Sequence, residues 1–445
     1  EWASIPPPRR AEYLLKFADI LTRRKWDLAR EMTREMGKVI QESGGDVQEA
    51  IDTAQYIFGE GHRMFGVVTA SELRDKWAMA YRRPVGVCAI ITPWNFPSDI
   101  PIWKIAPALL CGNTIVFKPS RETPKLATLL VQAFEEISLP PGVLNLVHGS
   151  GEAVGETLIA HPDVRLISFT GSVETGKHIA EVAGRTLKKV SLEMGGKNPV
   201  IVLDDADEEL VIEGVRWGAF GTTGQRCTAT SRLIVQKRIA HSLLPELTAR
   251  TRKLRLGNGL APSTEVGPII NSTQLEKIDR YVHIGRKEGA RLVTGGKIIK
   301  DGDYSTGYFY APTIFTGVTP KMTIFQEEIF GPVLAVTSVT TFEEAVRIAN
   351  GVRFGFSSSI YTRDVEKAFR AMNQLESGMT YVNAPTIGAE VHLPFGGVKE
   401  TGNGHREGAA WTLLAVFSEW KTVYVDYSGK LQKAQNIDTE VAVQS

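Results

Sequence analysis

The sequence predicts an α/β protein whose parallel sheets are covered by helices on both faces. Between residues 85 and 184, short apolar strands alternate four times with helical stretches. The same strand–helix rhythm returns between residues 200 and 395. Near-continuous apolar strands separated by helices are typical of parallel sheets that are buried on both sides. Because 445 residues exceed what one hydrophobic core usually holds, we expect two or three domains.

The composition excludes several classes of function. A net charge of +1 without a dense basic run provides no field for nucleic acid or for an anionic membrane surface. No apolar run in the sequence approaches the roughly 18 residues that cross a bilayer. Three widely spaced cysteines argue against a disulfide framework and favour a reducing compartment. We therefore expect a cytoplasmic protein that binds neither nucleic acid nor membrane.

The chain begins with helices and carries two extended segments outside the α/β units. Apolar positions at helical spacing predict a helix over 9–36 that ends at Gly37, and a second helix over about 44–65. Residues 66–84 alternate loosely like an extended ribbon, and the tail at 411–428 ends in KTVYVDY, which alternates like an edge strand. Exposed ribbons and edge strands pair readily with another subunit, so both segments predict a homodimer or a homotetramer.

The strands of the first α/β unit end in polar, glycine-rich sequences. The segments that follow these strands read PWNFP, KPS, HGSG and FTGS. Ligands of parallel sheets bind at the carboxyl ends of the strands, so these segments predict a nucleotide site. Gly171 and Ser172 open a helix directly after a strand, which would place a pyrophosphate on the helix N-terminal amides without a GxGxxG pattern.

One thiol lies in a setting that suits a nucleophile. Cys227 stands in GTTGQRCTATSR, where glycines precede it and small hydroxyl residues follow it. Such a segment leaves the sulfur accessible and brings backbone amides close to it. The alternative is a buried structural thiol, the usual state of a free cysteine. Cys88 in VGVCAII and Cys111 in PALLCGN fit that alternative.

Seven motifs follow one another along the chain: PWNFP, FKPS, FTGS, LEMGGKNP, GQRC, EEIFGP and PFGG. In this order they resemble the aldehyde dehydrogenase superfamily, and the resemblance covers nearly the whole chain. It implies oxidation of an aldehyde to a carboxylic acid with NAD or NADP. It also implies a Rossmann-type cofactor domain, an α/β catalytic domain and a small β element for oligomerisation. On this chain these parts would occupy, in the same order, 1–65 with 85–195, 196–410, and 66–84 with 411–428, followed by a tail at 429–445.

The resemblance assigns the chemistry to five side chains. Cys227 matches the nucleophile, which attacks the aldehyde carbon to form a thiohemiacetal and, after hydride transfer, carries a thioester. Glu193 matches the general base that activates water for hydrolysis. Asn95 matches the oxyanion donor, which acts together with the Cys227 backbone N–H. Lys104 and Glu407 resemble a proton relay that serves the base. No metal is expected.

The resemblance also implies a cofactor site on the first α/β unit and on EEIFGP. Trp94, Lys118 and Ser120 match positions around the adenosine phosphate and ribose. Glu328 and Phe330 match the pair that holds the nicotinamide ribose and ring. The complete predicted set is Thr92, Pro93, Trp94, Lys118, Ser120, Arg121, Gly151, Gly155, Phe169, Thr170, Gly171, Ser172, Glu328 and Phe330.

Arg121 in KPSR bears on the choice of cofactor. NAD-preferring relatives often carry a glutamate three residues after the strand lysine, here Lys118, where it bonds the adenosine 2′-hydroxyl. A glutamate would repel a 2′-phosphate, whereas Ser120 and Arg121 would attract one. We therefore predict that NADP is accepted and preferred over NAD. The alternative is an arginine that points to solvent.

The predicted substrate pocket combines Arg226, next to the nucleophile, with a wall from residues 382–397 that includes His392 and Phe395. Both segments resemble the semialdehyde branch of the family, notably 2-oxoglutarate semialdehyde dehydrogenases and, more distantly, aminoadipate semialdehyde dehydrogenases. A cation near the pocket suits an aldehyde with a distant carboxylate, such as 2-oxoglutarate semialdehyde. The alternative for Arg226 is a structural salt bridge.

Other functions stay open. Succinate semialdehyde, aminoadipate semialdehyde and a broad range of aliphatic or aromatic aldehydes are alternative substrates. A CoA-acylating dehydrogenase is an alternative reaction, although Glu193 argues against it because that reaction needs no water-activating base. A non-catalytic protein on the same scaffold would not need Cys227, Glu193 and Asn95 together.

Overall fold

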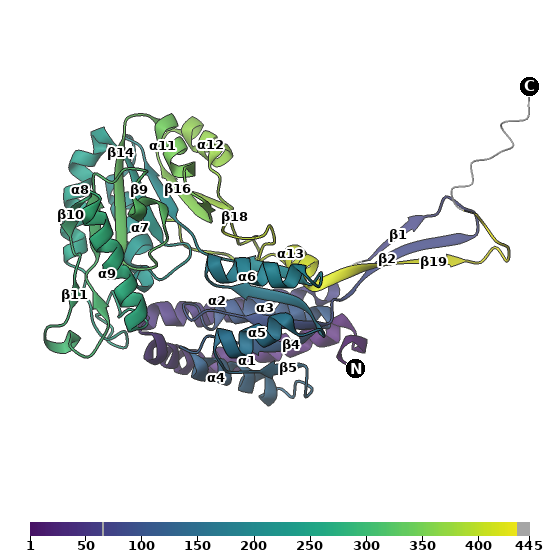
Figure 1. Ribbon diagram of the computed structural model, residues 1–445. Coiled ribbons are helices and arrows are strands. Elements are labelled where there is room, and N and C mark those ends of the chain that lie inside the picture. The colour runs from purple at the N-terminus through teal and green to yellow at the C-terminus, as the bar shows by residue number, and fades with distance from the viewer. Residues whose placement is uncertain (65, 434–445) are drawn as a thin grey trace, which may run out of the picture.

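A three-stranded arm projects from a body that contains two larger sheets (Figure 1). The computed structural model describes residues 1–64 and 66–433. The larger sheets contain five and seven strands, and one of the strand pairings within them is antiparallel while the others are parallel. This arrangement confirms the predicted α/β class, which followed from the alternation of apolar strands with helices.

The five-stranded sheet has the order β5–β4–β3–β6–β7 and carries helices on both faces. Its strands are β3 (Val87–Ile91), β4 (Thr114–Lys118), β5 (Leu144–Leu146), β6 (Val164–Thr170) and β7 (Lys189–Glu193). One face shares a hydrophobic core with α1 (Pro7–Met36), α2 (Ile40–Gly59), α3 (Asp99–Cys111) and α4 (Pro124–Glu136). The other face packs against α5 (Glu156–Ala160), which follows a π-helical turn at Gly151–Gly155, and against α6 (Val173–Gly184).

The long helix α1 shows how local sequence sets an element's limits. Pro7 stands at its first position, where the missing N–H of proline leaves no hydrogen bond unmade. Leu14, Phe17 and Leu21 recur at helical spacing and are fully buried. Gly37 ends the helix with a φ of +81°, a left-handed conformation that its missing Cβ permits. The predicted end of this helix is therefore confirmed.

The seven-stranded sheet has the order β10–β13–β14–β9–β8–β16–β17. Its strands are β8 (Asn198–Val202), β9 (Thr230–Gln236), β10 (Arg291–Thr294), β13 (Thr313–Thr316), β14 (Val333–Val339), β16 (Ser357–Tyr361) and β17 (Met379–Val382). One face packs against α7 (Glu208–Phe220) and α8 (Lys237–Arg252). The other face packs against α9 (Ser272–Lys287), α10 (Thr323–Gln326), α11 (Phe342–Asn350) and α12 (Val365–Gln374), in a core that continues to α6 of the first sheet.

Shorter elements order the loops around this sheet. The two-stranded pairs are β11 (Ile298–Ile299) with β12 (Phe309–Tyr310) and β15 (Phe354–Gly355) with β18 (Val398–Lys399). Helix α12 was missed by the sequence prediction, although Asp364 marks its start. The Asp364 carboxylate accepts a hydrogen bond from the Lys367 N–H, as an N-cap residue does.

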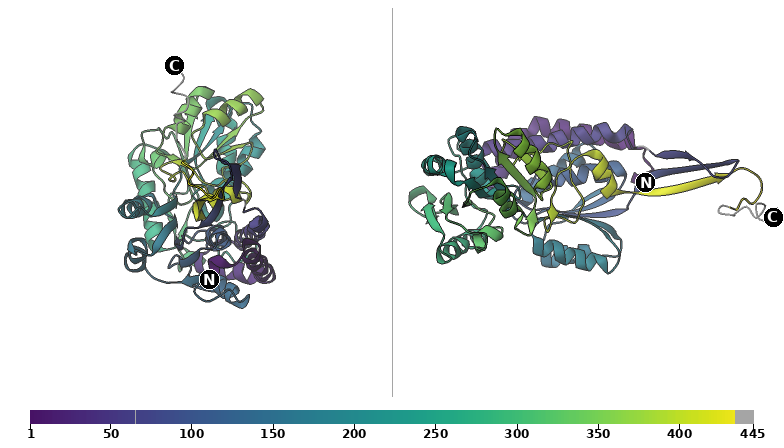
Figure 2. Two further views of the ribbon diagram at one scale, coloured as in Figure 1. Left: turned by 90° about the vertical axis from the view of Figure 1, so that its right-hand side faces the viewer. Right: turned by 90° about the horizontal axis from the view of Figure 1, so that it is seen from above.

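The arm consists of β1 (Val67–Ala70), β2 (Lys76–Pro84) and β19 (Ser418–Asp426), which pair in an antiparallel manner in the order β1–β2–β19. Figure 2 shows how far it extends beyond the body. The tail differs from the prediction in its first part, because Ala410–Phe417 forms helix α13 before β19 begins. A short apolar run such as AWTLLAVF does not distinguish helix from strand by its period. The end of the predicted tail, from residue 434, lies outside the described residues.

Among the helices of residues 1–64 and 66–433, none is long and apolar enough to cross a bilayer.

Candidate active site

The loop that carries Cys227 lies between α7 and β9 and is held in a strained conformation. Thr222 and Thr223 have φ angles of +49° and +57°. A β-branched residue rarely adopts this left-handed conformation, so surrounding contacts must stabilise it. The Glu42 carboxylate of α2 accepts hydrogen bonds from the Thr222 N–H at 2.9 Å and from its Oγ1 at 3.0 Å. Thr223 Oγ1 donates to the Gly267 carbonyl at 3.0 Å.

Arg226 takes part in the same set of contacts. Its Nη2 lies 2.8 Å from Glu42 Oε1, and its Nε donates to Thr222 Oγ1 at 2.9 Å. The guanidinium also lies 5.4 Å from the centre of the Phe96 ring. Arg226 therefore forms the structural salt bridge that was its alternative interpretation. Its charge is compensated by Glu42, and its role toward a substrate carboxylate stays a prediction.

Two cavities meet at Cys227. The first, here the cofactor-side cavity, has a volume of about 200 Å³. It brings together nine predicted residues: Pro93, Trp94, Asn95, Thr170, Gly171, Ser172, Cys227, Glu328 and Phe330. The Trp94 and Phe330 rings meet edge to face at 5.7 Å between centroids. Glu328 is anchored there, because its Oε1 accepts a hydrogen bond from the Gly196 N–H at 2.9 Å.

The predicted adenosine-binding residues gather at the carboxyl end of β4. Lys118 Nζ donates to the Gly149 carbonyl at 3.2 Å, and the Gly151–Gly155 turn follows directly. The Thr92 N–H donates to the Lys118 carbonyl at 3.2 Å, and Ser120 Oγ accepts from the Glu122 N–H at 3.2 Å. At the end of β6, Phe169 is buried. The Arg121 side chain is 75 % exposed, with its Nε 3.4 Å from Glu122 Oε1.

The second cavity, here the substrate-side cavity, has a volume of about 90 Å³. The predicted residues that line it are Thr170, Glu193, Arg226, Cys227, Phe395 and Glu407. Gly388 and Ala389 of the predicted wall 382–397 also line it. Sequence reasoning missed the other lining residues, which are Glu49, Phe96, Asp99, Ile100, Trp103, Thr228 and Phe356. The structure does not bring His392 to this lining: its ring is 53 % exposed and lies 3.3 Å from Glu390 on the loop surface.

Glu193 ends β7 and faces the substrate-side cavity from a fully enclosed position. It is 1 % exposed, and neither carboxylate oxygen has a hydrogen-bond partner among the described residues. Burial, and next the nearby Glu407 carboxylate, raise the pKa of Glu193 well above its usual range. A carboxylate with a raised pKa is a stronger base, which suits the role of activating water.

Lys104 and Glu407 form a buried ion pair beside Glu193. Lys104 Nζ also donates to Ser168 Oγ at 3.1 Å, so the ammonium is anchored between α3 and β6. Glu407 lines the substrate-side cavity with Glu193 and acts on its pKa. The predicted relay partners are therefore adjacent to the predicted base.

Burial, and then the Glu328 and Glu193 carboxylates, raise the pKa of the Cys227 thiol. The thiol is therefore neutral before a reaction begins and needs a proton acceptor to become a nucleophile. Asn95 is buried nearby, where its Nδ2 donates one hydrogen to the Gln225 carbonyl at 3.1 Å. The second hydrogen of that amide is left for a ligand in the cofactor-side cavity.

The comparison with known proteins agrees with this geometry. Residues 1–423 match the model of the family described as "Aldehyde dehydrogenase family". The chain belongs to this family. It is therefore an NAD(P)-dependent oxidoreductase that acts on the aldehyde group, as its motifs predicted.

Several relatives of the family are similar over most of their length. An α-ketoglutaric semialdehyde dehydrogenase of Bacillus subtilis (strain 168) is 44% identical, over 95% of this chain and 87% of the relative. A betaine aldehyde dehydrogenase of the same strain is 40% identical, over 95% of this chain and 86% of the relative. A crystal structure of betaine aldehyde dehydrogenase from Staphylococcus aureus in complex with NAD+ matches with a TM-score of 0.94 at 35% identity, over 97% of this chain and 85% of that chain.

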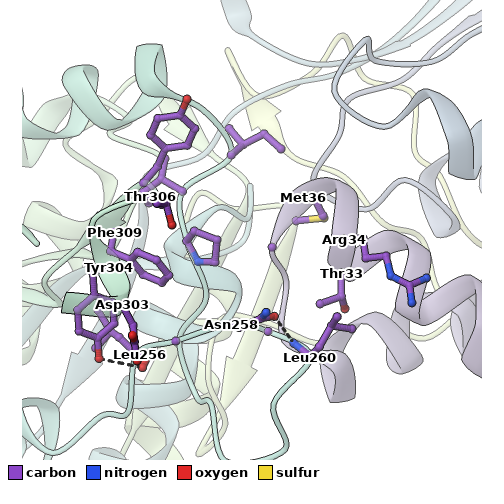
Figure 3. Close-up of a pocket in the computed structure, with 18 of the residues that line it drawn as sticks. Thr33, Arg34, Met36, Leu256, Asn258, Leu260, Asp303, Tyr304, Thr306 and Phe309 are labelled. Carbon is purple, nitrogen blue, oxygen red and sulfur yellow. Dashed lines mark hydrogen bonds between the residues drawn. The ribbon is translucent and has the colours of Figure 1, made fainter. Parts of the chain in front are cut away.

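A wider cleft of about 940 Å³ lies away from these cavities, between the end of α1 and the loops around Asn258 and Tyr304 (Figure 3). Tyr304 Oη donates to the Leu256 carbonyl at 3.2 Å, and Asn258 Oδ1 accepts from the Leu260 N–H at 3.0 Å. None of the predicted catalytic or cofactor residues lines this cleft. The other two cysteines, Cys88 and Cys111, are buried in β3 and α3 as structural thiols.

No group of three or more His, Cys, Asp or Glu side chains in the described part of the chain could hold a metal ion.

Proposed function

We propose that this aldehyde dehydrogenase oxidises its substrate by a hydrolytic route, with Cys227 as nucleophile and Glu193 as base. The observation that supports this most is the place of Cys227, where both cavities meet. An aldehyde in the substrate-side cavity and a nicotinamide in the cofactor-side cavity would then reach the same sulfur from two sides. Glu193 lines the substrate-side cavity with no competing hydrogen-bond partner among the described residues.

The residues present fit NAD(P). The N-terminus of α6 opens directly after β6, and Ser172 caps it by accepting a hydrogen bond from the Thr175 N–H at 3.2 Å. Helix N-termini bind pyrophosphate through their free amides. The Trp94 and Phe330 rings border the slot for the nicotinamide end, and the Glu328 carboxylate would accept bonds from ribose hydroxyls. The bound dinucleotide supplies the acceptor for the hydride.

In the first half of the reaction, the Cys227 thiol gives its proton to solvent water and Sγ bonds to the aldehyde carbon. The carbonyl oxygen becomes an oxyanion, for which the free Asn95 N–H and the Cys227 backbone N–H are the proposed donors. After the hydride has left this carbon, Cys227 carries a thioester. Glu193 then removes a proton from water, the hydroxide adds to the thioester carbon, and the C–S bond breaks to release the carboxylic acid.

Lys104 and Glu407 would return Glu193 to its ionised state. Glu407 stands beside Glu193, and its charge is held by the Lys104 ammonium. A proton taken up by Glu193 can therefore pass toward this pair. The CoA-acylating alternative needs no water-activating base, so Glu193 would have no function in it. An assay with and without CoA separates the two reactions.

Cys227→Ala tests the central proposal. Turnover should fall by roughly 10⁴-fold or more, because no other group replaces a removed nucleophile. Binding of NAD(P)H, followed by its fluorescence, should stay unchanged because the thiol forms only the inner end of the cofactor-side cavity. Aldehyde-dependent NAD(P)H formation at more than a trace in this variant would exclude Cys227 as the nucleophile.

For the cofactor, we propose that NADP is accepted and preferred. Arg121 extends into solvent beside Ser120, and a bound 2′-phosphate near β4 would lie within reach of its guanidinium. Glu122 stands next to Arg121, but its Oε1 also accepts a hydrogen bond from Asn271 Nδ2 at 3.2 Å. The acidic neighbour is therefore engaged elsewhere.

For the substrate, the names of the relatives point in two directions. The α-ketoglutaric semialdehyde dehydrogenase supports the predicted carboxylated semialdehyde. The betaine aldehyde dehydrogenases support an aldehyde with a quaternary ammonium group. Because Arg226 is paired with Glu42, the carboxylate of a semialdehyde would not meet an uncompensated cation at Arg226.

We also propose that the arm mediates homo-oligomerisation, as a dimer or a tetramer. Its two outer strands, β1 and β19, each have one edge without a strand partner in the described chain. Val67, Trp77 and Tyr424 are among its exposed apolar residues. Unpaired edges with apolar faces favour contact with a second copy. Removing residues 420–445 should shift the protein to monomer in analytical ultracentrifugation, and an unchanged oligomer would place the interface elsewhere.

A further inference from the structure

The substrate-side cavity contains more acidic than basic groups. Its lining includes four carboxylates, those of Glu49, Asp99, Glu193 and Glu407, and one guanidinium, that of Arg226. Glu407 is compensated by Lys104 outside the lining, and Arg226 is compensated by Glu42. Glu193 faces the sulfur as the proposed base. Glu49 and Asp99 then remain without an ion-pair partner among the described residues, although the Lys38 and Arg226 cations lie near them.

Glu49 and Asp99 come from two neighbouring helices, α2 and α3. Asp99 is 6 % exposed, and its Oδ1 has no hydrogen-bond partner among the described residues. Glu49 is half-buried, and no described side chain forms an ion pair or hydrogen bond with its carboxylate. Burying an acid without a partner is costly, so such groups usually mark a place that a ligand completes. Here the place is one wall of the cavity that contains Cys227.

Aromatic rings complete this cavity. Trp103 and Phe395 meet edge to face at 5.0 Å between centroids, and Phe356 and Phe395 do so at 5.1 Å. The negative faces of such rings attract a cation that lies over them. Rings alone would also accept a neutral apolar group, but rings beside two unpaired carboxylates favour a positive one. A carboxylate at the same place would be repelled by Glu49 once this acid is ionised, whereas a cation would favour the ionised forms of both Glu49 and Asp99.

We infer that the substrate is an aldehyde whose far end carries a cationic, ammonium-type group, held between Glu49, Asp99 and the aromatic rings. This inference rests on the proposed function, because it assumes that the aldehyde carbon lies at Cys227. Glu49 and Asp99 then determine specificity and take no part in bond making. The carboxylated semialdehydes become poor substrates.

The test compares aldehydes that differ in charge at similar size. Trimethylammonioacetaldehyde and its neutral isostere 3,3-dimethylbutanal differ chiefly in charge, and 4-oxobutanoate supplies a negative end. A fourth aldehyde, 3-aminopropanal, distinguishes a primary from a quaternary ammonium. The wild type should prefer the cationic aldehyde over its isostere by roughly ten- to a hundredfold in kcat/KM, with 4-oxobutanoate below both.

Three variants locate this preference. Glu49→Gln and Asp99→Asn should each lower the ratio of cationic to neutral kcat/KM by about tenfold. Glu49→Lys should raise kcat/KM for 4-oxobutanoate above that of the wild type. Glu366→Gln on α12, whose side chain is 79 % exposed, is the control with the same loss of charge. Because Glu49→Gln and Asp99→Asn are judged by a ratio of two substrates, a partial loss of folded protein does not change their result.

The pH dependence gives a second readout. Burial, then the Asp46 carboxylate, raise the pKa of Glu49 to about 7; the Arg226 and Lys38 cations lower it, and Asp52 also raises it. Burial, and next the Glu49 carboxylate, raise the pKa of Asp99 well above its usual range. The KM of the cationic aldehyde should therefore fall as the pH rises through about 7 and Glu49 ionises. The KM of the neutral isostere should not follow, and Glu49→Gln should abolish the difference.

The outcomes separate this inference from the proposed function. If no aldehyde gives NAD(P)H, the proposed function is wrong. If 3,3-dimethylbutanal is oxidised as well as its cationic isostere, or 4-oxobutanoate better than both, the inference is wrong and the proposed function stands. A cationic preference that survives both Glu49→Gln and Asp99→Asn would also overturn it, since another group would then hold the ammonium.

Discussion

The two cavities that meet at Cys227 are built in different ways. The cofactor-side cavity draws on chain segments that directly follow β3 and β6, and its residues come in contiguous runs such as Pro93–Asn95 and Thr170–Ser172. The substrate-side cavity draws on more separate elements, with residues from α2, α3, the Cys227 loop and the segment after β17. One cavity therefore depends largely on residues at strand ends, and the other on residues that helices and loops from separate parts of the chain bring together.

This difference indicates which parts of the protein determine cofactor binding and which determine substrate preference. A site at the ends of strands keeps its place when single side chains change, so cofactor binding depends mainly on the fold. A site formed by single side chains can change its charge through one substitution without disturbing the fold. The substrate-side cavity is therefore where relatives with different named substrates can differ most.

Glu193→Gln is the change in the substrate-side cavity with the largest expected effect. Steady-state turnover should fall by roughly 10²–10⁴-fold, because amide nitrogen and oxygen cannot accept the proton of the attacking water. The initial burst of NAD(P)H should remain, since hydride transfer precedes hydrolysis. Stopped-flow absorbance at 340 nm separates the two phases. If burst and steady state fell together, Glu193 would act before the thioester forms, as the acceptor of the Cys227 proton.

The pH dependence of the wild-type steady-state rate tests the same role of Glu193 as a base. Glu193 must be ionised to act, and its pKa is raised by burial and by Glu407. The steady-state rate should therefore decrease on the acid side of a pKa that lies above the usual glutamate range, and rise as the pH increases through it. Glu181→Gln on α6, whose side chain is 67 % exposed, should leave this profile unchanged.

The expected effect at Glu42 is smaller, because this residue touches neither cavity. Glu42→Ala removes the hydrogen bonds that hold Thr222 and Arg226, and charge-assisted bonds of this kind contribute about 1.5–3 kcal/mol. We expect kcat to fall by roughly tenfold or more while the Kd of NAD(P)H stays constant. Glu42→Gln keeps an acceptor for Thr222 and should recover part of the loss.

A readout on the thiol itself tests whether Glu42 acts through position. The rate of Cys227 alkylation by iodoacetamide should change in Glu42→Ala, whereas Glu12→Gln on the exposed face of α1 should behave as the wild type. An unchanged kcat and alkylation rate in Glu42→Ala would show that the Thr222–Thr223 turn keeps its conformation without this carboxylate. Other contacts would then stabilise the φ angles of +49° and +57° at Thr222 and Thr223.

The same contrast explains what the sequence could predict. The strand rhythm predicted the α/β class, and the glycine-rich strand ends predicted a nucleotide site that includes Gly171, because turns leave contiguous signatures. The roles of Trp94 and Cys227 followed from the family resemblance. Glu49 and Asp99 escaped prediction, since an isolated acid on a helix looks like a solvated one until the fold turns it inward. For Arg226 the sequence left a substrate contact and a salt bridge open, because its partner Glu42 lies on a helix far away in the sequence. Contacts between distant segments leave no local pattern.

The smallest effect is expected at the outer rim of the cofactor side, where Arg121 meets solvent. Its side chain is 75 % exposed, so a contact with a 2′-phosphate would be screened by water and ions. Arg121→Glu should reverse the preference between NADP and NAD by about tenfold, the equivalent of 1.4 kcal/mol. The change should appear in the KM for NADP, with kcat little altered, because Cys227 and Glu193 lie elsewhere. Raising the salt concentration should weaken the wild-type preference for NADP as well.

If the wild type used NAD alone, or if Arg121→Glu left the ratio of the two KM values unchanged, Arg121 would be a solvent-facing residue. In that case the Ser120 hydroxyl and the Lys118 ammonium would be left as the candidates to distinguish the two cofactors.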